Sequence, residues 1–183
     1  MAKVLVVVDM QNDFIDGSLG TREAEQIVGL VAEKISQYQR QAETIYFTKD
    51  THQTDYLETQ EGRNLPVLHC VKGTAGWHLA PQIQSAYEAV AQGQKGEVLF
   101  EKGQFGSLEL AQHIQRQYPN AEDLEIELVG LCTDICVLAN ALVLKTYMPE
   151  VKIRVDQHCC AGVTPESHEN ALSAMKMCQI EII

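Results

Sequence analysis

Short apolar runs alternate along the chain with longer stretches in which apolar residues recur at helical spacing. Val4 to Val8 are five consecutive apolar residues without polar alternation, which is typical of a β-strand covered on both faces. Residues 23–40 instead repeat apolar side chains three or four positions apart, which predicts an amphipathic helix. From these two patterns we predict six strands, at residues 4–8, 44–48, 97–100, 124–129, 151–155 and 179–183. The five predicted helices lie at residues 23–40, 81–92, 107–117, 133–147 and 165–177.

The order of these elements predicts the class of fold. Strands that alternate with helices form right-handed βαβ units, and such units build an open parallel sheet. No repeat, low-complexity tract or linker divides the 183 residues, so we expect a single domain over residues 1–183. One irregular segment, residues 50–79, is longer than loops in compact domains usually are. Its three histidines and four carboxylates favour a functional role for it.

Charge and apolar patterning exclude several classes of partner. The formal net charge of −11 disfavours nucleic acid and anionic membrane surfaces, both of which attract an excess of Lys and Arg. The apolar run that ends at Asp9 lacks the features of a signal peptide, and no apolar stretch reaches the roughly 20 residues of a membrane span. We therefore expect a cytoplasmic protein. Its six cysteines are expected to be reduced thiols.

Polar and reactive side chains follow four successive predicted strands. Asp9 follows the first strand, Asp50 the second and Lys102 the third, and the segment from Gly130 to Cys136 follows the fourth. In an open α/β sheet, ligands bind beyond the carboxyl ends of the strands. One polar residue after a strand is common, but four in succession indicate a functional site at this edge.

Cys136 is the candidate nucleophile. We expect Thr133 to cap the following helix, which places Cys136 in the first helical turn. There the helix dipole and free backbone N–H groups lower the pKa of a thiol and can stabilise an oxyanion. Two alternatives stay open: Cys132 and Cys136 are small buried apolar residues, or they form a redox pair. Their CxxxC spacing differs, however, from the CxxC of thioredoxin-like proteins.

Asp9 and Lys102 are candidates for the groups that assist this nucleophile. Asp9 ends an apolar run and is expected to be partly buried. A carboxylate in that environment can take the proton of a thiol and return it to a leaving amine. Lys102 can hold the thiolate and the carboxylate together. The alternatives are that Asp9 caps the following loop and that Lys102 is a solvated loop lysine.

A second cluster has the composition of a metal site. Asp50 and His52 lie two apart after a strand and can point to the same side, while His69 can fold back onto them. Glu58 and Glu61 lie between the two histidines. Mixed imidazole and carboxylate ligands suit Zn, Mn or Fe. The remaining histidines have no comparable partners and are expected to be structural or exposed: His78, His113, His158 and His168.

Taken in order, these segments resemble the isochorismatase-like cysteine hydrolases, and within them most of all the nicotinamidases. The resemblance runs nearly from end to end of the chain. The segments that carry it are Val7-Val8-Asp9-Met10-Gln11-Asn12-Asp13-Phe14, Asp50-Thr51-His52, His69-Cys70-Val71-Lys72-Gly73-Thr74, Glu101-Lys102 and Gly130-Leu131-Cys132-Thr133-Asp134-Ile135-Cys136-Val137.

The resemblance implies both the fold and the catalytic residues. The implied fold is a Rossmann-like three-layer α/β/α sandwich with a six-stranded parallel sheet. The implied catalytic triad is Asp9, Lys102 and Cys136. A cis peptide bond is implied before Cys132, and the backbone N–H groups of Cys132 and Cys136 would form the oxyanion hole. Phe14 would line the pocket for an aromatic ring.

The resemblance also implies a divalent metal, with zinc expected and manganese or iron as alternatives. Its ligands would be Asp50, His52 and His69, and we choose Glu61 as the fourth ligand, with Glu58 as a competitor. The metal would bind the pyridine nitrogen of the substrate. A departure from the nicotinamidase pattern is the stretch Leu65-Pro66-Val67-Leu68-His69, which has no aromatic residue before the later histidine.

The implied activity is hydrolysis of nicotinamide, a small molecule, to nicotinate and ammonia through a cysteine thioester, as in NAD salvage. One alternative is a related cysteine amidohydrolase that acts on another small amide, ureido or carbamoyl compound without the metal. Another is a catalytically silent protein that uses the pocket as a sensor. As in other sandwiches of this kind, we expect a homo-oligomer.

Overall fold

The computed structural model describes residues 1–183, apart from the side chain of residue 121. Its six strands form one sheet in the order β3-β2-β1-β4-β5-β6, and every neighbouring pair is parallel. The predicted six-stranded parallel sheet is therefore confirmed. The strands are β1 (Ala2–Val8), β2 (Thr44–Asp50), β3 (Leu99–Lys102), β4 (Leu124–Leu131), β5 (Lys152–Ala161) and β6 (Glu181–Ile182).

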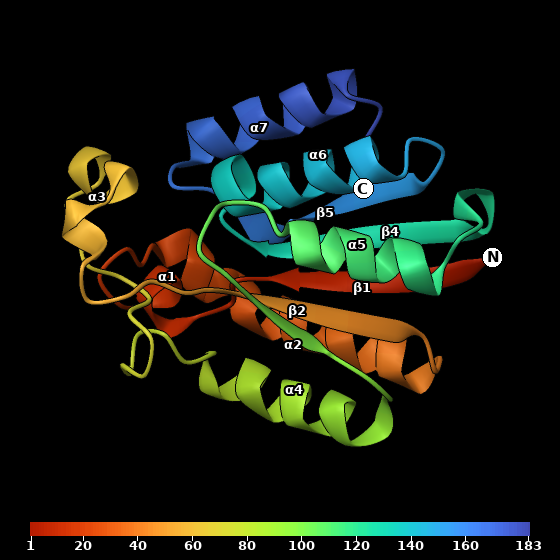
Figure 1. Cartoon of the computed structure of the whole chain (residues 1–183), viewed down its shortest axis with the longest axis horizontal. Helices are drawn as coiled ribbons and strands as arrows, with labels where there is room; N and C mark the ends of the chain where they lie inside the picture. Colours follow the sequence, from red (N-terminus) through yellow and green to blue (C-terminus); the bar gives the residue numbers. More distant parts are fainter.

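Helices cover both faces of the sheet, which gives the predicted three layers. Helices α2 and α4 pack on one face, and α5, α6 and α7 pack on the other (Figure 1). The helices are α1 (Asn12–Ile15), α2 (Arg22–Arg40), α3 (Gln60–Asn64), α4 (Pro81–Gly93), α5 (Leu108–Gln117), α6 (Leu138–Tyr147) and α7 (Pro165–Met177). No helix in the described part of the chain is long and apolar enough to span a membrane.

The central strand β1 explains why its sequence shows no polar alternation. Successive side chains of a strand point to opposite faces of the sheet. Val4 and Val6 accordingly lie in the core beneath α5, α6 and α7, whereas Leu5 and Val7 lie in the core beneath α2 and α4. Because both faces are covered, each of these side chains is buried, and each such burial contributes about 1.5–3 kcal/mol.

Several boundaries differ from the sequence prediction. Strand β5 continues to Ala161, six residues beyond the predicted end at residue 155, because polar residues interrupt the apolar run that the prediction followed. One of them, Asp156, is buried and paired with Lys34 of α2, with the Lys34 Nζ 2.8 Å from the carboxylate Oδ2. The predicted strand at residues 179–183 is shorter, and the expected irregular segment at residues 50–79 contains α3 and a 3₁₀ turn.

Gly130 allows β4 to lie against β1 at the edge where the candidate site begins. Its φ is +118°, and a Cβ there would lie 2.1 Å from the carbonyl oxygen of Val8, its partner in the sheet. The pairing of β4 with β5 also shifts register between Leu128 and Gly130. A glycine is therefore required by both backbone conformation and space.

The first prediction concerns this glycine. Gly130→Ala is expected to lower the free energy of unfolding by about 1–3 kcal/mol or more, because alanine strains the backbone and overlaps the neighbouring strand. Denaturant unfolding followed by circular dichroism measures the change. Gly29→Ala is the matched control, because Gly29 lies on α2 with nothing within 4 Å of an added Cβ. The control should be neutral or stabilising by roughly 0.5–1 kcal/mol, and an equal loss in both variants would contradict the explanation.

Candidate active site

The carboxyl ends of four neighbouring strands converge on one edge of the sheet, on the side that carries α1 and α3 (Figure 1). Asp9 follows β1, Asp50 ends β2 and Lys102 ends β3. The turn that carries Cys136 follows β4. Because β3, β2, β1 and β4 are adjacent in the sheet, side chains far apart in the sequence meet here, as the strand-end pattern predicts.

The ammonium group of Lys102 lies at the centre of this cluster. Its Nζ is 2.6 Å from Asp9 Oδ2 and 3.5 Å from Asp50 Oδ1, and it donates a hydrogen bond of 3.4 Å to the Sγ of Cys136. All four residues are buried, with Asp9 0% exposed. Lys102 is therefore not a solvated loop lysine, and the three residues predicted to act together lie in contact.

The environment of Asp9 favours its neutral form more than water does. Burial raises the pKa of its carboxyl group, and the nearby charge of Lys102 offsets part of that rise. The hydroxyl of Thr48 donates a hydrogen bond of 2.6 Å to Asp9 Oδ1, which fixes the orientation of the carboxylate. Burial opposes the charge of Lys102, but Asp9, Cys136 and Asp50 raise its pKa, so the ammonium stays protonated.

Cys136 lies in a π-helical turn, Thr133–Val137, that precedes α6. The prediction that Thr133 caps this helix is wrong: residue 132 holds the N-cap position, and the Thr133 hydroxyl hydrogen-bonds Nδ1 of His168 at 2.8 Å instead. The expected cis peptide bond is present between Leu131 and Cys132.

The prediction that the helix terminus lowers the pKa of the Cys136 thiol is also wrong. Burial raises this pKa well above its ordinary value, and the negative charge of Asp9 raises it further, while Lys102 lowers it. Desolvation of the thiolate thus outweighs the charge of Lys102, which acts in the opposite direction. The thiol is consequently stable in its protonated form and needs a base to become a nucleophile.

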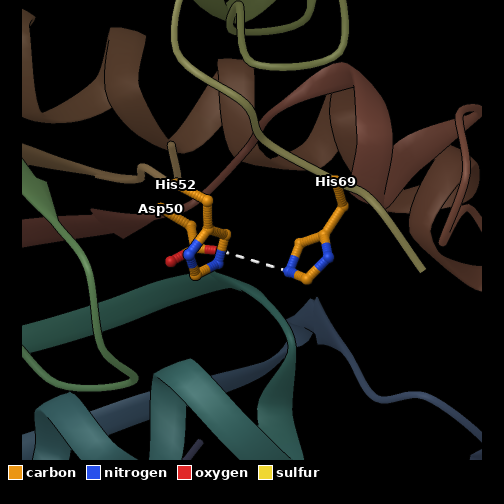
Figure 2. Close-up of side chains that lie close together, drawn as sticks. All are labelled: Asp50, His52 and His69. Atoms are coloured by element: carbon orange, nitrogen blue, oxygen red, sulfur yellow. Dashed lines mark ion pairs between the residues drawn. The ribbon is translucent and has the colours of Figure 1, made fainter. Parts of the chain in front are cut away.

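A second group of side chains lies next to this cluster. Figure 2 shows Asp50, His52 and His69 pointing toward one another, and their candidate ligand atoms all lie within 4.8 Å. Asp50 Oδ2 is 2.9 Å from His52 Nε2 and 3.5 Å from His69 Nε2. Glu61 Oε1 is 3.6 Å from His52 Nε2 and 4.0 Å from His69 Nε2. Glu58 is exposed and makes no such approach in the described contacts.

The chemistry of these side chains fits a divalent metal. The Nε2 of His52 is buried and has no hydrogen-bond partner among the described residues, although it faces the Asp50 carboxylate. Burial opposes ionisation of Asp50, but the adjacent imidazoles of His52 and His69 and the charge of Lys102 hold its pKa well below its usual range. Two imidazoles with two carboxylates are a donor set typical of zinc.

A cavity of about 300 Å³ joins the two groups. Cys136 lines it together with Asp50, Glu61 and His69. Phe14, the predicted ring-binding residue, also lines it, with its ring centroid 5.6 Å from that of His69. Sequence reasoning missed the rest of the wall, because these residues come from separate segments that only the fold brings together. They are Leu19, Leu65, Phe105, Ile135 and Val163, whereas Cys132, which also lines the cavity, was predicted as an oxyanion-hole residue.

The comparison with known families agrees with this arrangement. A family model described as the isochorismatase domain matches residues 3–183. The chain belongs to the isochorismatase family. The match covers nearly the whole chain, including the sheet and the segments that carry both groups of side chains at its edge. Like other members of the isochorismatase family, the chain is a hydrolase.

Individual isochorismatase-family proteins resemble the chain along their whole length. A nicotinamidase/pyrazinamidase of Mycobacterium tuberculosis is 28% identical over an alignment of 194 residues with gaps, which covers 99% of this chain and 98% of that protein. The crystal structure of a nicotinamidase/pyrazinamidase from Bacillus subtilis is 29% identical, with a TM-score of 0.84, and covers 100% and 99% of the two chains. The structure of a pyrazinamidase of Pyrococcus horikoshii in complex with zinc is 26% identical, with a TM-score of 0.78 and the same coverage.

The second prediction concerns the charge of Asp9. Asp9→Asn is expected to lower the pKa of the Cys136 thiol, because it removes a negative charge that raises this pKa and leaves Lys102 in place. Alkylation of the peptide that carries Cys136, followed by mass spectrometry across neutral and alkaline pH, should therefore accelerate at a lower pH than in the wild type. The exposed Cys178 is an internal control. A profile for Cys136 that stays in place or moves to higher pH would contradict the described electrostatics.

Proposed function

We propose that this chain hydrolyses nicotinamide to nicotinate and ammonia through a thioester at Cys136. The observation that carries the proposal is the shared cavity, which is lined by the buried thiol of Cys136 and by Asp50 and His69. Asp50, His52, Glu61 and His69 are together called the metal-binding group. One small molecule in this cavity can therefore present a carboxamide to the thiol of Cys136 and a ring nitrogen to the metal-binding group.

Asp9 acts as the general base in the first step. It takes the proton of the Cys136 thiol, and the thiolate attacks the carbon of the amide. The raised pKa of the Asp9 carboxyl supports this role, because a buried carboxylate accepts a proton more readily than one in water. Lys102, 2.6 Å from Asp9 and 3.4 Å from Cys136, stabilises the thiolate while it exists.

The same carboxyl group returns the proton in the second step. The tetrahedral intermediate collapses with cleavage of the C–N bond, and the protonated Asp9 gives its proton to the leaving amino group, which departs as ammonia. A water molecule then gives a proton to Asp9 and attacks the thioester. As the C–S bond breaks, Asp9 returns this proton to the leaving thiolate, which restores the thiol, and the nicotinic acid leaves as nicotinate after it loses its proton to solvent. The backbone N–H groups of Cys132 and Cys136 hold the oxyanion in both steps.

The metal-binding group binds and orients the ring. We propose Asp50, His52, Glu61 and His69 as ligands, with Glu61 preferred to Glu58 because its Oε1 faces both imidazoles. A bound divalent metal would supply a Lewis acid that takes the pyridine nitrogen of the substrate. Zinc is the proposed ion, supported by the donor set and by the zinc in the Pyrococcus horikoshii pyrazinamidase.

The cavity wall favours an uncharged aromatic substrate. Phe14 offers a ring face, and the described lining residues include no Lys or Arg that would bind a phosphate or carboxylate substituent. A cavity of about 300 Å³ lies at the lower end of the roughly 300–1,000 Å³ typical of ligand sites, which suits a single small ring.

The third prediction tests both the substrate and the metal. Purified protein should release ammonia from nicotinamide, lose that activity after treatment with a chelator, and regain it when zinc is added back. The physical reason is that without the metal the ring nitrogen has no partner to position the amide against Cys136.

The matched control is Cys136→Ala, which should keep the fold and lose turnover, because no other thiol lies against Lys102 in the described contacts. Turnover by a clean Cys136→Ala sample would contradict the assignment of Cys136 as the nucleophile. If metal-loaded protein leaves nicotinamide intact but hydrolyses a ureido or carbamoyl compound, the proposal that nicotinamide is the substrate is contradicted.

A further inference from the structure

Three residues between Asp9 and Phe14 take no part in the proposed chemistry, although they lie beside it. Gln11 is 0% exposed, and the side chains of Gln11, Asn12 and Asp13 all hydrogen-bond to backbone atoms of distant segments. Side chains that hydrogen-bond to the backbone of distant segments fix the position of those segments relative to one another.

Asp13 holds the segment that carries His69. The Oδ2 of Asp13 accepts a hydrogen bond of 2.7 Å from the backbone N–H of Cys70, the residue directly after His69. Cys70 has a φ of +47°, a left-handed conformation that non-glycine residues rarely adopt. The charge-assisted bond to Asp13 stabilises this conformation, which in turn sets how the chain turns between His69 and Val71.

The same residue links His69 to His52. The carbonyl oxygen of Cys70 accepts a hydrogen bond of 3.0 Å from the backbone N–H of His52. The next residue, Val71, pairs with His52 in an isolated parallel bridge. Asp13 therefore acts on both histidines, because Cys70 joins them through its N–H and its carbonyl group.

The space around the Asp13 carboxylate is closed by Gly76. A Cβ at Gly76 would lie 2.1 Å from Asp13 Oδ2, and the backbone N–H of Asp13 donates to the Gly76 carbonyl oxygen at 3.0 Å. Glycine at this position permits the carboxylate to reach Cys70. The loop therefore leaves space for the Asp13 carboxylate, which a side chain at residue 76 would fill.

Gln11 holds a third proposed ligand, Asp50, in the same way. Its Oε1 accepts from the backbone N–H of Asp50 at 2.8 Å, and its Nε2 donates to the Asp50 carbonyl oxygen at 2.8 Å and to the Trp77 carbonyl oxygen at 2.9 Å. A side-chain amide that bonds both backbone groups of one residue fixes that residue in place. Asp50 is therefore tied to the segment that follows β1, as Cys70 is.

We propose that Asp13, supported by Gln11, is a positioning residue for the metal-binding group: it sets the spacing of His52 and His69 through the backbone of Cys70. The inference rests on the metal site of the proposed function. Partners outside the ligands themselves commonly change metal affinity about 10–100-fold when they are removed. A purely structural role for Asp13 would instead change the stability of the metal-free protein and leave the affinity unchanged.

The fourth prediction is a loss of zinc affinity in variants of Asp13. Affinity is measured by competition with a chromophoric chelator, and folding of each metal-free variant is checked by thermal unfolding. Asp13→Ala should bind zinc about 10–100-fold more weakly than the wild type. Asp13→Asn, which keeps an acceptor oxygen in the same place, should recover most of that loss. Asp16→Ala is the matched control, because it removes a nearby exposed carboxylate, and it should bind zinc like the wild type.

If Asp13→Ala does not fold, Asp13→Glu carries the test. It keeps the charge but moves the carboxylate by one methylene group, so it should also bind zinc more weakly. A folded Asp13→Ala or Asp13→Glu protein with wild-type affinity would overturn the proposal and leave the proposed function intact. Wild-type protein that binds no zinc, manganese or iron would contradict the metal site itself and overturn this proposal with it.

Discussion

The buried ammonium of Lys102 is the charge on which the arrangement at this edge of the sheet depends. It lies 2.6 Å from Asp9 and 3.5 Å from Asp50, and without it two carboxylates would share a region almost free of water. Removing one partner of a buried ion pair typically costs about 3–5 kcal/mol, because the other charge is left uncompensated. The pair is thus better understood as a constraint on position than as a source of stability. It keeps Asp9 near the Cys136 thiol, from which Asp9 is proposed to take a proton.

The strand order explains why one lysine can serve both groups of side chains. Strand β2 lies between β1 and β3, so Asp50 at its end lies next to the Asp9–Lys102 pair. Asp50 also contacts the two histidines and therefore lies between them and that pair. One carboxylate oxygen of Asp50 faces Lys102 and the other faces His52 and His69. Asp50 is therefore in contact both with the charge of Lys102 and with the side chains that would hold a metal.

The sequence was sufficient for the sheet and for the residues at its edge, and insufficient for what depends on packing. The run from Val4 to Val8 predicts a central strand because burial on both faces removes every polar position. The residues that directly follow such strands can then be identified in the sequence as candidates for the site. Strand β5 was underestimated because Asp156 looks like the end of a strand unless its partner Lys34 is known. The sign of the pKa shift of Cys136 was wrong because desolvation depends on the side chains around the thiol. Glu61 and Glu58 were inseparable because they lie on separate short turns whose orientation only the fold determines.

In the proposed function, the Cys136 thiol, held by Lys102 and activated by Asp9, forms a covalent intermediate with the amide. Mass spectrometry of cysteine peptides after acid quenching of the enzyme during turnover of nicotinamide tests this step. A nicotinoyl group is expected on Cys136, with the other five cysteines unmodified. Turnover that leaves every cysteine unmodified, or that places the acyl group on Cys132, would contradict this step.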